Sequence, residues 1–224
     1  MDHVSLTKAN RLFWLGRYSE RVYTTLQYLR PHYDRLIDGG GFNYPDFCAR
    51  LGIPCPYTDE QDFFARYPLD PTDPCSIRSA ADQMLGNGMV LRETLSSTTL
   101  SYLQMAVSAM EQATRSTSPA VEMQWVLDDI LAFRGSFDDY IDEESTRNII
   151  KCGIGAERIS LYLRLGFRPE SLGKELSMLL NRLYKSELET DPSALEVLTA
   201  RVVEHSTGTP DRELAFAAER LFLV

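Results

Sequence analysis

The sequence lacks the features that most directly point to a chemical reaction. Its four cysteines, at positions 48, 55, 75 and 152, include no Cys-x-x-Cys pair, and its three histidines lie far apart, at positions 3, 32 and 205. Both absences argue against a zinc site. The nucleophile motif Gly-x-Ser-x-Gly, the dinucleotide-binding fingerprint and the ending of a phosphate-binding loop are missing as well. We therefore expect neither a metal nor a cofactor, and the motifs specify no reaction.

Positive charge and long apolar runs are also scarce. Acidic residues outnumber basic ones by 32 to 23, which gives a formal net charge of -9. This balance argues against nucleic acid and against an anionic membrane surface as partners, because their phosphates would be repelled. No stretch approaches the roughly 18 apolar residues of a spanning helix, and the first residues lack the apolar core of a signal peptide. We expect a cytoplasmic protein with reduced cysteines.

Helical periodicity is what the sequence does contain. Apolar residues recur three or four positions apart from residue 5 to residue 29, which predicts a first helix that Pro31 ends. Two short helical pieces are expected at 46–51 and 58–66. One long helix is expected from 76 to about 114, with a kink or close packing at the glycines of Gly86-Asn87-Gly88.

Later helix starts are marked by prolines. Ser118-Pro119, Asp191-Pro192 and Thr209-Pro210 each place a capping residue before a proline, and Pro169 marks a further start. No convincing β alternation occurs. The sequence therefore predicts an all-α helical bundle, and we expect one domain over residues 1–224.

A glycine-spaced Glu-Arg pair occurs twice. "GRYSERV" spans residues 16–22 and "GIGAERI" spans residues 153–159. In each copy glycine comes first, Glu-Arg takes the fifth and sixth places, and a β-branched residue comes last. The helical neighbours of Glu157 include no cation, and those of Arg158 include no anion. If that surface is buried, each charge needs a partner from another helix.

We hypothesise that the two motif helices pack antiparallel about an internal pseudo-two-fold axis. Glu20 would then reach Arg158, and Glu157 would reach Arg21. The glycine one turn before each glutamate would let another backbone or a ligand approach closely. Such an ion network has two possible roles. It can fix which helix faces which, or it can form a ligand-binding or catalytic site.

The chain resembles the alpha-E domain family, bacterial helical proteins named for a Glu-Arg motif. The segments that carry this resemblance are "LTKANRLFWLGRYSERV", "LDPTDPCSIRSAADQMLGNGMVLRETLSS" and "FRGSFDDYIDEESTRNIIKCGIGAERI". In the second motif, Ile154 stands where members often have a basic residue.

The resemblance transfers Glu20, Arg21, Glu157 and Arg158 as the motif residues. Arg17, Arg92 and Glu93 complete the set of candidate site residues.

The resemblance implies a setting more than a reaction. Similar proteins are encoded beside circularly permuted ATP-grasp proteins and transglutaminase-like or amidoligase proteins, in systems thought to form amide bonds. It favours a non-catalytic helical partner of an ATP-grasp-type ligase, with a peptide or amino acid as a possible ligand.

The alternative is an enzyme or ligand-binding domain of the same system. Arg21 and Arg158 would hold a carboxylate or phosphate by bidentate bonds. The further ligand-binding candidates are Arg17, Arg92 and Glu93. Glu20 or Glu157 would serve as the general base.

Overall fold

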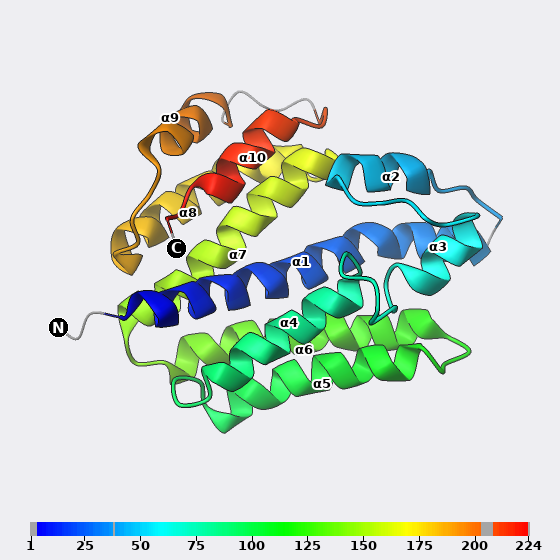
Figure 1. Ribbon diagram of the computed structural model, residues 1–224, viewed down its shortest axis with the longest axis horizontal. Coiled ribbons are helices and arrows are strands. Elements are labelled where there is room, and N and C mark those ends of the chain that lie inside the picture. Colours follow the sequence, from blue (N-terminus) through cyan, green and yellow to red (C-terminus); the bar gives the residue numbers. More distant parts are fainter. Residues whose placement is uncertain (1–3, 38, 203–207, 224) are drawn as a thin grey trace. The chain divides into compact units, whose positions relative to one another are not determined.

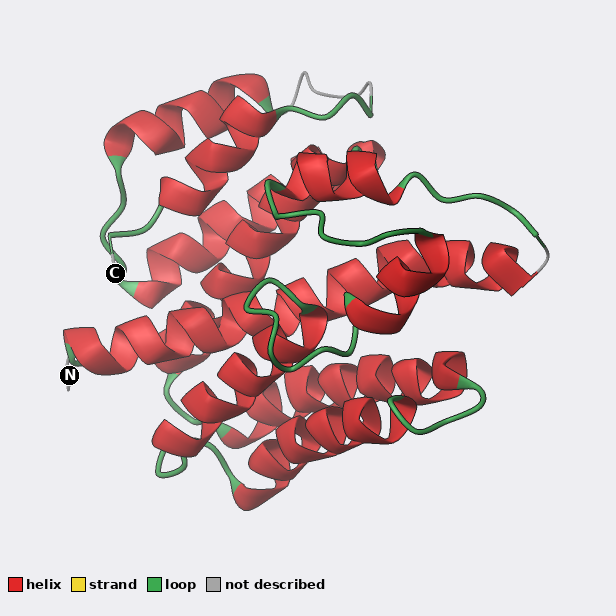
Figure 2. Ribbon diagram, turned by 45° about the vertical axis from the view of Figure 1, so that its right-hand side comes forward, coloured by secondary structure: helices red, strands yellow, loops and turns green. Residues whose placement is uncertain are grey.

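The computed structural model describes residues 4–37, 39–202 and 208–223 (Figure 1). Within these residues the chain forms ten α-helices and one short 3-10 helix and no β-strand (Figure 2). A single antiparallel bridge pairs Thr190 with Phe222. The all-α prediction is confirmed. No helix in this described part has the length and apolar character needed to cross a membrane.

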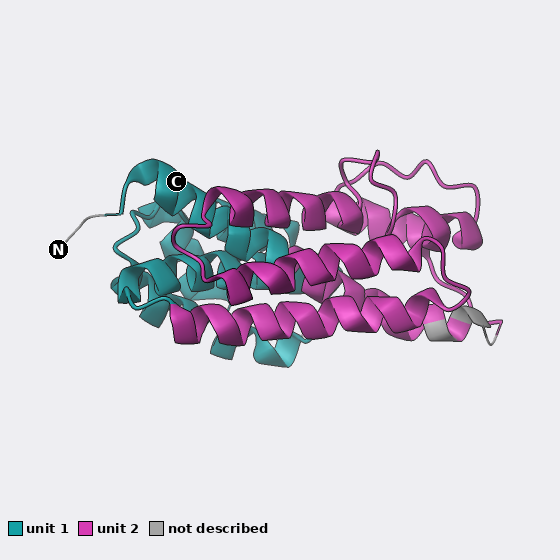
Figure 3. Cartoon of the chain, turned by 90° about the horizontal axis from the view of Figure 1, so that it is seen from below, with its two compact units in different colours: residues 1–20, 141–224 teal, residues 21–140 magenta. Residues whose placement is uncertain are grey.

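The chain divides into two compact units (Figure 3). Unit 1 comprises residues 1–20 and 141–224, and unit 2 comprises residues 21–140. The boundary between Glu20 and Arg21 falls inside α1 (Leu6–Ile37), so this one helix supplies residues to both units. The single domain expected over residues 1–224 stays a prediction.

Unit 1 is built around α7 (Glu144–Leu165), which is buried along most of its length. Helices α8 (Leu172–Ser186) and α10 (Arg212–Arg220) pack against α7, and α9 (Pro192–Arg201) packs against α10. The 3-10 helix η1 (Pro169–Ser171) leads into α8, as the start signal at Pro169 predicts. The carbonyl oxygen of Leu221 accepts a hydrogen bond from the amide of Asp191, which ties the C-terminal segment to the start of α9.

Two aspartates cap the last helices of unit 1. Asp191 accepts hydrogen bonds from the amides of Ser193 and Ala194, so the predicted start at Asp191-Pro192 is confirmed. The start predicted at Thr209-Pro210 is wrong, because the capping residue of α10 is Asp211, which accepts from the amide of Leu214 at 2.9 Å. Its own amide donates to the carbonyl of Leu163 in α7, which anchors the helix start two residues later than predicted.

Unit 2 contains α2 (Tyr44–Leu51), α3 (Glu60–Arg66), α4 (Ile77–Val90), α5 (Ser97–Ala113), α6 (Pro119–Tyr140) and the second half of α1. The two short helices and the start at Pro119 are confirmed. Helices α5 and α6 form an antiparallel hairpin, and α4 packs on α5 (Figure 1).

The predicted end of the first helix at Pro31 is wrong, because α1 continues to Ile37 with the proline inside it. Proline removes one amide donor and costs about 3 kcal/mol in a helix interior. The turns around the proline are held by an aromatic cluster of unit 2, in which ring centroids lie 4.5 to 5.8 Å apart. Its contacts include Tyr28 with Phe47, His32 with Phe42, and Tyr33 with Phe64.

The single helix expected from 76 to about 114 is also wrong, since α4 and α5 are separate helices. The chain turns after Val90, and the Ser96 hydroxyl then caps α5 by accepting from the amide of Thr99 at 3.0 Å. The expected close packing is present at Gly88, where an added Cβ would come within 3.0 Å of the Leu103 side chain. Gly88 thus lets α4 approach α5 before the break.

Candidate functional site

The two motif glycines lie where α1 and α7 cross in unit 1. A Cβ on Gly16 would come within 3.0 Å of the carbonyl oxygen of Ile150, and a Cβ on Gly153 would come equally close to the carbonyl oxygen of Phe13. In both cases the obstacle is backbone, which cannot rotate away as a side chain can. Glycine is therefore required at both positions for this helix crossing.

One turn beyond Gly16 and Gly153, the motif glutamates accept hydrogen bonds across this crossing. Arg158 presents a two-pronged contact to Glu20: its Nε donates to one carboxylate oxygen at 2.9 Å and its Nη2 donates to the other at 2.8 Å. The ion pair predicted between Glu20 and Arg158 is therefore present. The same guanidinium uses Nη1 to donate to Glu175 of α8 at 2.9 Å. Arg158 thus joins three helices of unit 1.

The second glutamate is bound by Arg17. The Nε of Arg17 donates to Oε2 of Glu157 at 2.7 Å, and its Nη2 lies 2.6 Å from the same oxygen. The guanidinium also lies 4.8 Å from the centre of the Trp14 ring, a cation–π distance. Arg17, expected as a candidate ligand contact, therefore binds a motif carboxylate.

This network of Arg17, Glu20, Glu157, Arg158 and Glu175, called the Glu-Arg network below, is largely closed to water. Glu20 is 0% exposed and Glu157 is 2% exposed. Burial by itself would lower the pKa of Arg158, but the carboxylates of Glu20 and Glu175 outweigh it and raise that pKa above its ordinary value. Three carboxylates and two guanidinium groups meet here, so most of the buried charge is neutralised within the cluster.

The contacts at the crossing are reciprocal. Gly16 approaches Ile150 and Ile154, while Gly153 approaches Phe13 and Arg17. Gly16 and Gly153, Phe13 and Ile150, and Arg17 and Ile154 are each 137 positions apart, the same offset that separates the two Glu-Arg pairs. The equivalence ends at Ile154. This residue is the counterpart of Arg17 but has no charge with which to bind a carboxylate. The internal repeat, as a property of the whole fold, stays a prediction.

The remaining candidate residues lie in unit 2. Arg21 is half-buried, and its charge lowers the pKa values of Tyr67 and Cys75 against the larger effect of burial. Because Glu157 belongs to unit 1, the predicted Glu157–Arg21 pair stays a prediction. Arg92 and Glu93 lie in the turn between α4 and α5, with their side chains exposed to solvent and 3.3 Å apart. Their proposed contact with a ligand is also untested.

Glu175 is the member of the network that sequence reasoning missed. Its helical neighbours are Ser171, Leu172, Met178 and Leu179, none of which is a cation. The criterion that singled out Glu157 would therefore have found Glu175 too. Near this end of the network lies Tyr162, whose phenol has a pKa raised by burial and influenced by the charges of Arg158 and Glu20.

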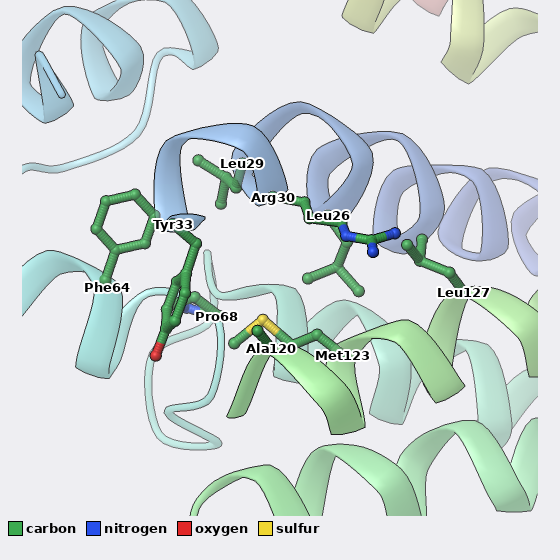
Figure 4. Close-up of a pocket in the computed structure, with 9 residues that line it drawn as sticks. All are labelled: Leu26, Leu29, Arg30, Tyr33, Phe64, Pro68, Ala120, Met123 and Leu127. Carbon is green, nitrogen blue, oxygen red and sulfur yellow. The ribbon is translucent and has the colours of Figure 1, made fainter. Parts of the chain in front are cut away.

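Other places in the described residues are poorer candidates. No group of three or more histidine, cysteine or acidic side chains there is arranged to hold a metal ion. His32 packs at a tilt against Phe42 in the aromatic cluster, and His3 and His205 lie outside the described residues. Unit 2 also contains an apolar cavity beside the second half of α1 (Figure 4). Its volume of about 10 Å³ suits at most one water molecule, so we do not assign it a ligand.

The model of the Alpha-E family, described as a predicted alpha-helical domain with a conserved ER motif, matches residues 7–187. The matched segment contains both Glu-Arg pairs, and also Arg17 and Glu175. No curated protein and no solved structure matches the chain.

Proposed function

The chain belongs to the Alpha-E family, and from this premise we propose that it is a helical accessory protein of an ATP-grasp-type system that forms amide or peptide bonds. In this proposal the ATP-grasp-type ligase supplies the ATP-dependent chemistry, and this chain binds the ligase or its peptide substrate. The setting comes from the family resemblance, which links such proteins to ATP-grasp and amide-forming neighbours.

The observation that carries the non-catalytic role is the closure of the Glu-Arg network. A general base must lie within hydrogen-bonding reach of the proton that it removes. Both carboxylate oxygens of Glu20 already accept N–H groups from Arg158, and the side chain is fully buried. Glu157 is similarly buried and accepts from Arg17. This arrangement supports a structural tie between α1 and α7.

The alternative is an enzyme or ligand-binding domain that uses the same groups. The observation that favours it is the partial exposure of Arg158, whose side chain is 17% exposed, and of its partner Glu175. A carboxylate or phosphate ligand would take the place of Glu175 on the Arg158 guanidinium. Glu20 or Glu157 would then act as the base.

Conservative variants can distinguish the accessory role from the enzyme when both their folding and the amide product are measured. We would express the chain with its neighbouring ATP-grasp-type protein, test their co-purification, and assay amide product with ATP and amino acids. The accessory role predicts that Glu20→Gln and Arg158→Lys lower the free energy of unfolding, and that product falls only as far as the folded fraction does. Lost product with unchanged stability would favour the enzyme, and absence of co-purification would contradict the accessory role.

A further inference from the structure

The α5–α6 hairpin of unit 2 has an outward face that carries large apolar side chains. The inner faces of these helices fill the core, but Met105 of α5 is 50% exposed and Trp125 of α6 is 48% exposed. Both side chains line one groove of about 370 Å³, which Ala109 also lines. Val121, one turn before Trp125, is exposed as well. Large apolar side chains that gather on a surface mark places where other molecules bind.

The same groove is lined by two acidic side chains. Asp128 and Asp129 follow Trp125 by three and four residues on α6 and line the groove beside it. None of the residues that line this groove is basic. Burial and the neighbouring Asp128 charge raise the pKa of Asp129. A cationic group bound here would therefore relieve repulsion between the two carboxylates.

The groove is elongated. It shares Ser108 and Gln112 with an adjoining hollow of about 620 Å³ that continues along α5 towards the turn into α6. Glu111 and Glu122 lie along this continuation, with Arg115 as its one cation. An open channel between two helices suits an extended or helical segment better than a small molecule, which prefers an enclosed pocket.

We propose that this groove, lined by Met105, Ala109, Trp125, Asp128 and Asp129, binds a basic amphipathic helix of a partner protein. An arginine or lysine of that helix would lay its aliphatic stem and charged head on the Trp125 ring and reach the two aspartates. Its apolar residues would cover Met105 and Val121. The inference rests on the proposed accessory function, to which it adds the docking surface and the chemistry of the partner.

Charge complementarity selects this occupant over others. Nucleic acid and anionic lipid would meet two carboxylates. A purely apolar helix would bury both carboxylates without supplying a cation, although Asp128 would keep the hydrogen bond that the Gln124 amide donates to it at 2.7 Å. A basic helix satisfies the aspartates and covers the tryptophan at once. Aromatic residues surrounded by complementary charge commonly dominate the energetics of such interfaces.

The test uses a peptide of about 18 residues, made of leucine and arginine and designed as an amphipathic helix. A peptide with glutamate in place of each arginine serves as its counterpart. The chain has two tryptophans, so the indole N–H signals in an NMR spectrum can be assigned with Trp125→Phe. We expect the Trp125 signal to shift saturably as the basic peptide is added, and to shift less at high salt. The acidic peptide should cause no shift. Absence of a saturable shift would overturn the inference.

Matched variants on the same helix test which residues matter. Trp125→Ala and the double variant Asp128→Asn/Asp129→Asn should each weaken peptide binding at least about tenfold. Leu131→Ala removes a side chain that is also 48% exposed but lies outside the groove. Asp138→Asn/Asp139→Asn makes the same change of charge elsewhere on α6. Both control variants should bind the basic peptide as tightly as the wild type does. Equal losses of affinity in test and control variants would contradict the assignment of the peptide site to this groove.

The same variants separate this inference from the proposed function. If the neighbouring ATP-grasp-type protein co-purifies equally with the wild type and with both groove variants, the groove is not the docking surface, and the accessory role stands. If that protein fails to co-purify while the basic peptide binds as predicted, the accessory role is wrong and the groove remains a site for a basic helix. Loss of co-purification in the groove variants alone supports both.

Discussion

At the scale of single residues, the Glu-Arg network depends on the shape of the guanidinium group. Arg158 uses all three nitrogens of its guanidinium group to bind two carboxylates at once. These bonds fix the position of Glu20 relative to Glu175. A lysine has a single point of charge and cannot reproduce that planar arrangement. Arg17 completes the cluster from the opposite helix, with Trp14 against its guanidinium.

Removal of one buried partner of an ion pair should therefore lower the free energy of unfolding strongly. We predict that Glu157→Ala lowers the free energy of unfolding by about 3 to 5 kcal/mol, because it deprives the buried Arg17 of a carboxylate. The control is Glu93→Ala, since Glu93 lies in an exposed turn and pairs only with Arg92, which is also exposed, among the contacts described. We expect a change of at most about 0.5 kcal/mol there. Urea denaturation measures both, and equal losses would contradict the network's structural role.

A buried thiol should make the fold sensitive to alkali. Burial raises the pKa of Cys152 to about 12, from 9.0 for an ordinary thiol. The folded state therefore holds this proton more tightly than the unfolded state does, and the associated stability is complete below pH 9 and is lost as the pH rises towards 12. Free energies of unfolding from pH 7 to 10.5 should fall less steeply for Cys152→Ala than for the wild type. Parallel curves would refute the assignment to this thiol.

At the scale of elements, the crossing of α1 and α7 is set by its two glycines. Gly153→Ala would drive a methyl group into the Phe13 carbonyl, and we predict a loss of at least about 2 kcal/mol of stability. Gly135→Ala is the matched control, because Gly135 also lies inside a helix but its added Cβ would meet nothing within 4 Å. That variant should gain up to about 1 kcal/mol from helix propensity. Thermal unfolding distinguishes them, and a stabilised Gly153→Ala would show that the helices do not touch there.

The sequence predicted most helices from periodicity and capping, and failed where tertiary contacts override local signals. Proline ends an isolated helix, yet Pro31 lies inside α1 because aromatic packing around it stabilises the turns on both sides. The break between α4 and α5 follows a continuous apolar pattern, and the Ser96 cap that reveals it stands within a run of similar hydroxyl residues. The Glu20–Arg158 pair was predictable because charges on an apolar helix surface need partners from elsewhere.

At the scale of the whole molecule, the network joins residues far apart in the chain. The contacts from Arg158 to Glu20 and from Arg17 to Glu157 span 138 and 140 positions. Unit 1 is therefore completed only when residues from both ends of the sequence come together, while unit 2 is continuous in sequence. Arg17 as a partner for Glu157 could not be predicted from local sequence, because its choice depends on the register at which the two helices cross.

Glu20 and Arg158 stabilise the fold through each other, because each neutralises the buried charge of the other. The most direct test is a double-mutant cycle with Glu20→Gln, Arg158→Gln and the combined variant, measured as free energies of unfolding in urea. We predict a coupling energy of about 2 kcal/mol, within the range found for residues in contact. A coupling energy below about 0.5 kcal/mol would contradict the claim, because the two side chains would then contribute independently.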